Sequence, residues 1–158
     1  MAKHSTVIVL PALILGLGVC EDASGDATSA PSVAVLAPQD VRYVEDAKVP
    51  GVAAAVVAGD PRTGHYTLRV RFAASAKVPA HVHPDDRTVT VLSGTYYFGV
   101  GDRYDARGLS AHGPGTVIVV PKGIAHYAAA GQEEVVLQES GPGPTANTIL
   151  EPVPPPRP

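Results

Sequence analysis

The centre of the chain is a series of short segments in which apolar and polar residues either alternate or form brief apolar runs. In residues 66–72 aromatic and aliphatic side chains alternate with threonine and arginine, which predicts a strand with one buried and one wet face. The apolar runs 52–58 and 117–120, the second closed by Pro121, predict two buried strands. The pattern is therefore that of β-structure.

Residues 81–94 predict a further strand that ends in a turn at Ser93 and Gly94. The remaining strands are expected at 95–100, 126–129 and 135–139, with a Gly- and Asp-rich loop at 101–108. These segments make seven or more short strands with hardly any helical pattern. Such a chain is predicted to fold as an all-β sandwich or barrel.

Two histidines, His81 and His83, are separated by one residue within a predicted strand. Successive side chains of a strand face opposite sides, so both imidazoles point to one face. His126 follows a buried strand, after Pro121 and Gly123 have closed that strand and turned the chain. If the two segments are neighbours in a small closed sheet, the third imidazole joins the first two inside it.

The two histidine segments resemble the two motifs of the cupin family. The first motif reads Gly, five residues, His-x-His, three or four residues, Glu, six residues, Gly, and its matches are His81, His83 and Gly94. The second reads Gly, five residues, Pro-x-Gly, two residues, His, three residues, Asn, and its matches are Gly115, Pro121, Gly123 and His126. The resemblance covers roughly residues 52–137, and the two motifs together are a specific signal.

The resemblance implies a cupin-type small β-barrel, or double-stranded jelly roll. It also implies one divalent transition metal ion (Fe, Mn, Ni, Cu or Zn) held by His81, His83 and His126, with open positions for water, substrate or a carboxylate. The expected activity is that of an oxygenase, isomerase or decarboxylase acting on a small molecule. A non-enzymatic binding or storage module, and a metal-free structural cupin, remain open. Homodimers formed through the outer strands are a further expectation of the resemblance.

Three positions depart from the motifs: Ser75 replaces the leading Gly, Arg87 the metal-binding Glu, and Ala130 the closing Asn. A guanidinium carries a fixed positive charge and only donors, so Arg87 cannot take over the role of a metal-binding carboxylate. Strand parity points Arg87 inward, where it would bind the carboxylate or enolate of a substrate. In the alternative, Arg87 pairs with Asp85, Asp86 or another acid at the barrel mouth.

The neighbouring acids have two readings as well. Asp86 would become a fourth metal ligand if Pro84 marks a bulge that shifts the register. Otherwise Asp86 caps backbone groups in a turn, and Asp85 faces solvent.

The other histidines and the aromatic residues are assigned to simpler roles. His4 lies in the leading segment, and His65 and His112 are expected at the surface. Four aromatic residues are expected to line or pack the barrel: Tyr96, Tyr97, Phe98 and Tyr127.

Composition agrees with a single domain and excludes several function classes. The chain has 158 residues, 45% of them hydrophobic and 17% charged, and a formal net charge of -3 without a basic run, so nucleic acid is not an expected partner. A small molecule is. No nucleophile elbow, phosphate-binding glycine loop or dinucleotide fingerprint is present. Cys20 is the only cysteine, which excludes an intramolecular disulfide.

The N-terminal segment of the chain predicts export. Lys3 precedes an apolar run at 7–19 that has the length of a secretory h-region, so residues 1–20 are predicted to be a signal peptide. The position of Cys20 directly after this run resembles the lipidated cysteine of bacterial lipoproteins; an ordinary signal peptide with an incidental cysteine is the alternative. Either kind of signal predicts a periplasmic, extracellular or lipid-anchored protein.

The sequence outside the leading segment divides into three parts. Residues 21–40 are predicted to be a flexible linker, 41–150 the barrel domain and 151–158 a proline-rich tail. Contact with a membrane is expected only through the signal or a lipid anchor at Cys20.

Overall fold

A computed structural model describes residues 33–151 of the chain. The predicted signal peptide with Cys20, most of the predicted linker and nearly all of the tail lie outside these residues, and the division of the chain into those parts stays a prediction. Across residues 33–151, no helix has both the length and the apolar character needed to cross a membrane.

The described residues form short strands and two single-turn 3-10 helices, which agrees with the predicted absence of longer helices. The helices are η1 (Pro38–Asp40) and η2 (Ala106–Gly108). The strands are β1 (Val44–Glu45), β2 (Val52–Gly59), β3 (Tyr66–Phe72), β4 (Lys77–Val82), β5 (Arg87–Ser93), β6 (Tyr96–Val100), β7 (Ser110–His112), β8 (Val117–Val120), β9 (His126–Ala130), β10 (Val135–Gly141) and β11 (Thr148–Glu151).

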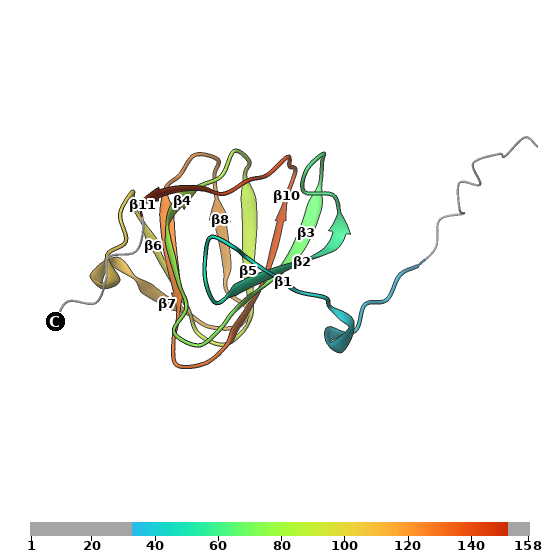
Figure 1. The fold of residues 1–158 in the computed structure, drawn as a ribbon, viewed down its shortest axis with the longest axis horizontal. Helices are drawn as coiled ribbons and strands as arrows, with labels where there is room; N and C mark the ends of the chain where they lie inside the picture. The colour runs from blue at the N-terminus through green and yellow to red at the C-terminus, as the bar shows by residue number, and fades with distance from the viewer. Residues whose placement is uncertain (1–32, 152–158) are drawn as a thin grey trace, which may run out of the picture. The chain divides into compact units, whose positions relative to one another are not determined.

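The strands make two antiparallel sheets that face each other across the core (Figure 1). One sheet has the order β1-β2-β3-β10-β5-β8 and the other the order β11-β4-β9-β6-β7. The core contains residues of both sheets, and its largest fully buried side chains are Leu137, Val91 and Val135. The all-β fold predicted from the alternating segments is therefore confirmed, and so is the jelly roll that the resemblance to cupins implied.

The segment 81–94, predicted as one strand and a turn, is instead two strands in different sheets. β4 ends at Val82 and β5 begins at Arg87. Pro84 has no N–H for a ladder, and the side chain of Asp86 accepts a hydrogen bond from the Lys122 N–H at 2.8 Å, so the connecting residues do not extend either strand. The alternation of inward and outward side chains nevertheless continues from β4 into β5, because the odd-numbered residues from 81 to 91 are all buried.

The four motif positions that call for glycine share one backbone conformation. Gly94, Gly115 and Gly123 have φ angles of 75°, 88° and 74°, and Ser75 has a φ of 62°. Only glycine reaches this left-handed region without steric cost. Ser75 therefore keeps the backbone that the motif requires while carrying a side chain that disfavours it.

The aromatic residues divide between the two faces of their sheet. Tyr96 belongs to the core, and the Phe98 ring packs against it, whereas alternation places Tyr97 and Tyr127 on the outer face. Tyr127 pairs with Gly99 on β6 and contacts the Tyr104 ring at a centroid distance of 5.4 Å. The prediction that all four aromatic residues line or pack the barrel is confirmed for Tyr96 and Phe98. Tyr127 is buried as well, but on the outer face of its sheet and outside the core cluster, and Tyr97 is only half-buried on that face.

Candidate metal centre

Three histidines meet between the sheets. His81 on β4 and His126 on β9 are direct cross-strand partners, and His83 follows the end of β4. The ring centroids lie 4.3 Å apart for His81 and His126, 4.8 Å for His81 and His83, and 5.1 Å for His83 and His126. All three side chains are buried, and the ligand nitrogens that they offer lie within 4.8 Å of one another. The structure thus brings together the three histidines that the sequence selected.

Hydrogen bonds to the backbone fix which nitrogen of each ring carries the proton. Nδ1 of His81 lies 2.8 Å from the Pro79 carbonyl oxygen, and Nδ1 of His126 lies 2.9 Å from that of Ile124. Nδ1 of His83 lies 2.9 Å from the carbonyl oxygen of Ala146. A carbonyl oxygen can only accept, so each Nδ1 is the donor and each Nε2 is left with its lone pair free.

Burial keeps these imidazoles neutral. It lowers the pKa of His83 from 6.5 to about 3, with a further contribution from the nearby Arg87 charge, and it lowers the pKa of His126 to about 4. The pKa of His81 is lowered as well, mainly by burial. A neutral imidazole is the form that binds a metal ion, so no proton has to leave the site at neutral pH.

The histidines form part of the lining of a cavity of about 680 Å³ between the sheets. Most of the remaining lining is apolar and comes from the inward faces of β2, β3 and β5, including Leu68, Val70 and Val89. Arg87 and Glu139 add charged groups on the strands, and the chain around β1 and the turn after β2 add four more, Arg42, Asp46, Lys48 and Arg62. This volume is suited to a small organic molecule.

Arg87 is buried in a network with two acids. Its Nη1 donates to Glu139 Oε2 at 2.9 Å, and its Nη2 donates to Asp85 Oδ1 at 3.2 Å and to the hydroxyl of Thr145. The side chains of Arg87 and Asp85 are only 4% and 3% exposed. Arg87 thus lines the cavity, as strand parity predicted, and also pairs with acids, as the alternative predicted. Its role in binding a substrate stays a prediction.

The two acids of this network differ in their electrostatics. Burial alone would raise the pKa of Asp85, but hydrogen bonds from Thr145 and Tyr66 and the charge of Arg87 outweigh it and lower that pKa. For Glu139 burial dominates over Arg87 and raises the pKa. Tyr66, which donates to Asp85 Oδ2 at 2.8 Å, has its pKa raised to about 12, mainly by burial. Asp85 is therefore the firmly ionised partner of Arg87.

The other acids near the motif do not join the histidines. Asp86 is exposed and caps the Lys122 N–H, which is the second of its two predicted roles. The prediction that Asp85 faces solvent was wrong, because Tyr66, Thr145 and Arg87 hold it inside. Ala130, at the position of the closing Asn, is buried in the core.

Sequence reasoning missed three members of the network: Tyr66, Glu139 and Thr145. A signal existed for two of them, because alternation puts Tyr66 in line with Leu68 and Val70, and Glu139 in line with Val135 and Leu137, on the inward faces of their strands. Thr145 lies in an irregular connection between β10 and β11, and no periodicity points to it.

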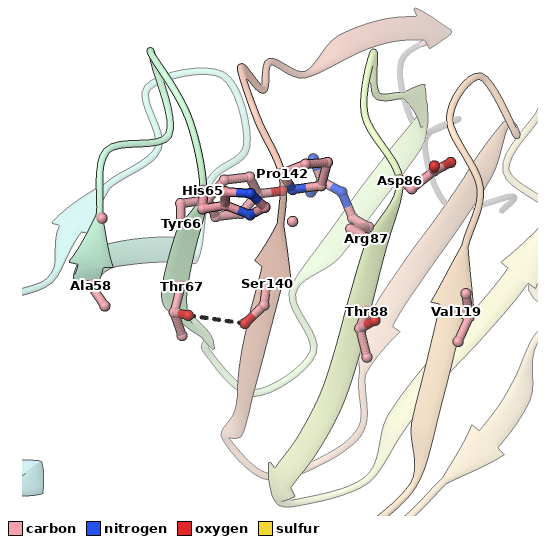
Figure 2. Close-up of a pocket in the computed structure, with 12 residues that line it drawn as sticks. Ala58, His65, Tyr66, Thr67, Asp86, Arg87, Thr88, Val119, Ser140 and Pro142 are labelled. Carbon is pink, nitrogen blue, oxygen red and sulfur yellow. Dashed lines mark hydrogen bonds between the residues drawn. The ribbon is translucent and has the colours of Figure 1, made fainter.

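A second hollow of about 610 Å³ lies at the end of the first sheet (Figure 2). Thr67 and Ser140 point into it from neighbouring strands, with their hydroxyl oxygens 3.1 Å apart. Figure 2 shows Arg87 reaching from β5 toward the end of β10, whereas Asp86 points the opposite way. The three metal-binding candidates do not line this hollow.

Several solved structures share the fold. The polyketide cyclase RemF from Streptomyces resistomycificus matches with a TM-score of 0.61 at 19% identity, over 76% of this chain and 88% of the cyclase. KdgF from Halomonas sp. matches with a TM-score of 0.55 at 20% identity, over 70% of this chain and 95% of KdgF. The DMSP lyase DddQ from Ruegeria pomeroyi DSS-3 matches with a TM-score of 0.57 at 16% identity, over 70% of this chain and 61% of the lyase. At these identities the likeness shows the fold alone.

No curated protein matches the chain. A family model does: the ChrR cupin-like domain matches residues 31–143, which include both histidine motifs and nearly all of the two sheets. With the jelly roll and the three inward histidines established, this match shows the family. The chain belongs to the family of ChrR cupin-like domains, within the cupin superfamily.

Proposed function

We propose that the chain binds one divalent transition metal ion through Nε2 of His81, His83 and His126, and that it acts as a metal-dependent enzyme on a small molecule in the cavity. One observation carries this proposal: all three Nδ1 atoms are committed to backbone carbonyls, and the rings are gathered within the barrel. Each ring therefore carries its proton on Nδ1, and the three free Nε2 atoms can bind the same metal ion.

The donor set fits a transition metal. Neutral imidazoles suit Fe, Mn, Ni, Cu and Zn, and three protein ligands leave positions open, as catalytic rather than structural sites require. The backbone acceptors of the Nδ1 protons orient the rings, which is the usual role of groups behind metal-binding histidines. The ion would supply Lewis acidity toward a substrate oxygen.

The chain's own residues supply binding and orientation. Apolar side chains such as Leu68, Val70 and Val89 line the cavity together with the histidines, and the Phe98 ring packs at a centroid distance of 5.3 Å from the His126 ring. Arg87 cannot ligate a cation, and its pairing with Asp85 and Glu139 offsets its charge beside the imidazoles. A cation can thus approach three neutral ligands without facing an unpaired guanidinium.

Oxygenase, isomerase and decarboxylase reactions all suit an ion with open positions beside a small cavity. The cyclase and the lyase among the similar structures are named as enzymes, which supports an enzymatic use of the fold here. A non-enzymatic binding module is the second candidate, and the observation that favours it is the replacement of the motif glutamate by Arg87, held in two ion pairs.

Elemental analysis of protein purified without chelator or metal affinity resin tests the metal site. We expect about one transition metal ion per chain, and at least a hundredfold loss of affinity in each of the variants His81→Ala, His83→Ala and His126→Ala. His65→Ala is the matched control, because His65 is exposed and lies outside the cluster. Metal content that is unchanged in the three variants would contradict the site.

Turnover separates the enzyme from the binding module. Protein loaded with Fe(II) or Mn(II) is incubated under air with a panel of small acids, diketones and phenols, and dioxygen uptake and product formation are followed. We expect turnover of at least one compound that the His126→Ala variant does not support. Retained metal and bound compound without turnover would identify the binding module instead.

We also propose that the protein is exported and that it pairs through its outer strands. The apolar run 7–19 after Lys3 supports export, and the mass of the mature N-terminus from a fractionated cell tests it. A mature chain that begins near residue 20, with or without lipid on Cys20, is expected. Light scattering of the mature chain tests the dimer.

A further inference from the structure

The two carboxylates that pair with Arg87 differ in how many hydrogen bonds they accept. Asp85 accepts from Tyr66 at Oδ2, and from Thr145 and Arg87 at Oδ1. Glu139 accepts from Arg87 at Oε2, and its Oε1 accepts no hydrogen bond from any residue that the structure describes. Asp85 is saturated, whereas Glu139 keeps one oxygen available to a ligand.

Glu139 is also placed where a ligand would meet it. It follows Val135 and Leu137 on the inward face of β10, and it lines the cavity that His81, His83 and His126 also line. Its side chain is 14% exposed, more than that of either Arg87 or Asp85. The free oxygen is thus a basic group that a molecule bound in this cavity would meet on β10.

The surroundings of Glu139 favour proton transfer. Burial raises its pKa, the charge of Arg87 opposes this, and the negative charge of Asp85 adds to it. The pKa of Asp85 shifts the opposite way. A pair of carboxylates whose pKa values are pushed apart by their environments is a common sign of separate roles, with the raised one as the acid or base.

Other titratable groups around Glu139 are less suited to this role. Tyr96 on β6 is fully within the core, and burial raises its pKa further from neutrality. Tyr66 on β3 is committed to Asp85, and Arg87 on β5 has a fixed charge. Asp46 also lines the cavity, but it lies in the loop between β1 and β2, where its Oδ1 accepts from the backbone N–H groups of Lys48 and Val49. Glu139 is the carboxylate that presents an open oxygen from the inward face of a strand.

We propose that Glu139 is the catalytic acid–base residue of the cavity, and that the substrates are small carbonyl compounds with an acidic C–H bond next to the carbonyl group. This inference rests on the proposed function, and it selects proton transfer over oxidation among the classes named there. The C–H bond breaks, its proton passes to Glu139 Oε1, and the electron pair remains on the substrate as an enolate. The carboxylic acid then returns the proton to the same carbon or to another one.

The exchange of substrate hydrogen for solvent deuterium tests this step directly. Cyclohexanone and pyruvate, one neutral and one anionic, are incubated in D2O with protein loaded with Zn2+, and the loss of the α-proton signal is followed by NMR. A positioned general base typically contributes about a hundredfold to ten-thousandfold in rate. We expect exchange above background with at least one probe, and at least a hundredfold loss in Glu139→Gln.

Three controls separate a proton-transfer role from a structural one. Glu139→Asp keeps a carboxylate and is expected to restore part of the exchange, whereas Glu134→Gln, at an exposed glutamate on the adjacent turn, is expected to behave as the wild type. Metal content and melting temperature are measured on the same samples. Full exchange in a folded, metal-loaded Glu139→Gln variant would overturn the proposal.

A titration provides a readout independent of turnover. In protein labelled with 13C at the glutamate carboxyl groups, the signal missing from Glu139→Gln is expected to titrate above the ordinary value of about 4.3. A midpoint below that value, or metal-loaded wild type that exchanges neither probe, overturns the inference. Wild type that binds no metal contradicts the proposed function instead, so the two failures are distinguishable.

Discussion

Arg87 and Glu139 are joined across adjacent strands by a 2.9 Å contact between Nη1 and Oε2, inside the barrel and beside the histidine cluster. Cupins usually carry a metal-binding glutamate at the position of Arg87, so this chain has a positive charge where they have a negative one. Glu139, on the neighbouring strand, compensates the charge of Arg87. The cavity therefore keeps a carboxylate, but on β10, the strand next to the one that carries the motif position.

Removing Arg87 should destabilise the protein strongly. In Arg87→Met, Asp85 and Glu139 lose their shared cation and remain buried as two acids, which typically costs about 3–5 kcal/mol. Chemical denaturation measures the loss. The control is Arg62→Met, whose ion pair with Asp60 is at the surface, and which should leave the unfolding midpoint unchanged. Equal effects of the two substitutions would mean that the buried network adds no more to the free energy of unfolding than a surface ion pair does.

The metal-free protein should lose stability as the pH falls below about 6.5. The unfolded histidines bind protons near that value, whereas folded His126 and His83 resist protonation until about pH 4 and 3. Between these limits the unfolded state binds more protons, so the free energy of unfolding falls by up to about 1.4 kcal/mol per pH unit for each histidine. Above pH 6.5 these groups contribute no slope.

Urea denaturation at several pH values, with chelator present, checks this slope. Glu139 acts in the opposite sense, because its raised pKa stabilises the folded state at low pH, but two or more histidines outweigh one carboxyl group. His83→Gln should reduce the slope, since glutamine does not titrate. A free energy of unfolding that stays constant between pH 6.5 and 4.5 would contradict neutral burial of the rings.

Tyr127 should couple to two glycines in different ways. A Cβ at Gly108 would overlap the hydroxyl of Tyr127, with the next ring atom 3.6 Å away, whereas a Cβ at Gly99 would overlap the ring itself. Both Gly108→Ala and Gly99→Ala should therefore destabilise the protein. Tyr127→Phe should rescue the first substitution and leave the second unrescued, which thermal unfolding of the double variants measures. Equal rescue of both would disprove this arrangement.

Ser75→Gly should stabilise the protein. Ser75 is exposed and has a φ of 62°, a conformation that costs a non-glycine residue about 1–2 kcal/mol. Part of that gain is offset by the greater freedom of glycine in the unfolded chain, so a net increase of about 0.5–1 kcal/mol is expected. Ser93→Gly, at an ordinary backbone position in β5, is the comparison and should not stabilise.

The sequence was informative wherever a segment was long enough to show its period. Residues 66–72 and 117–120 form strands with the predicted bounds, and the histidine pair faces inward as parity required. β4 was predicted only at its last two residues, and three strands escaped prediction altogether. These three are β1, β7 and β11, which have two to four residues and lie at sheet edges. Edge strands of this length bury little, so their hydrophobic pattern is too short to recognise.

The site was predictable in its histidines and not in its charges. The spacing of His81, His83 and His126 specified their convergence because it follows strand parity and a turn. The partners of Arg87 could not be found in this way, since Glu139 and Thr145 lie 52 and 58 residues farther along the chain. Their meeting depends on the pairing of β5 with β10 and on the path of the chain after β10.

The hydrogen bonds behind the histidines make the site depend unequally on distant parts of the chain. His81 and His126 are each oriented by a carbonyl two residues earlier, on β4 for His81 and in the turn before β9 for His126. His83 instead relies on Ala146, 63 residues away. A chain shortened just after β10 would accordingly lose the acceptor of the His83 Nδ1 proton while it keeps the acceptors of the other two.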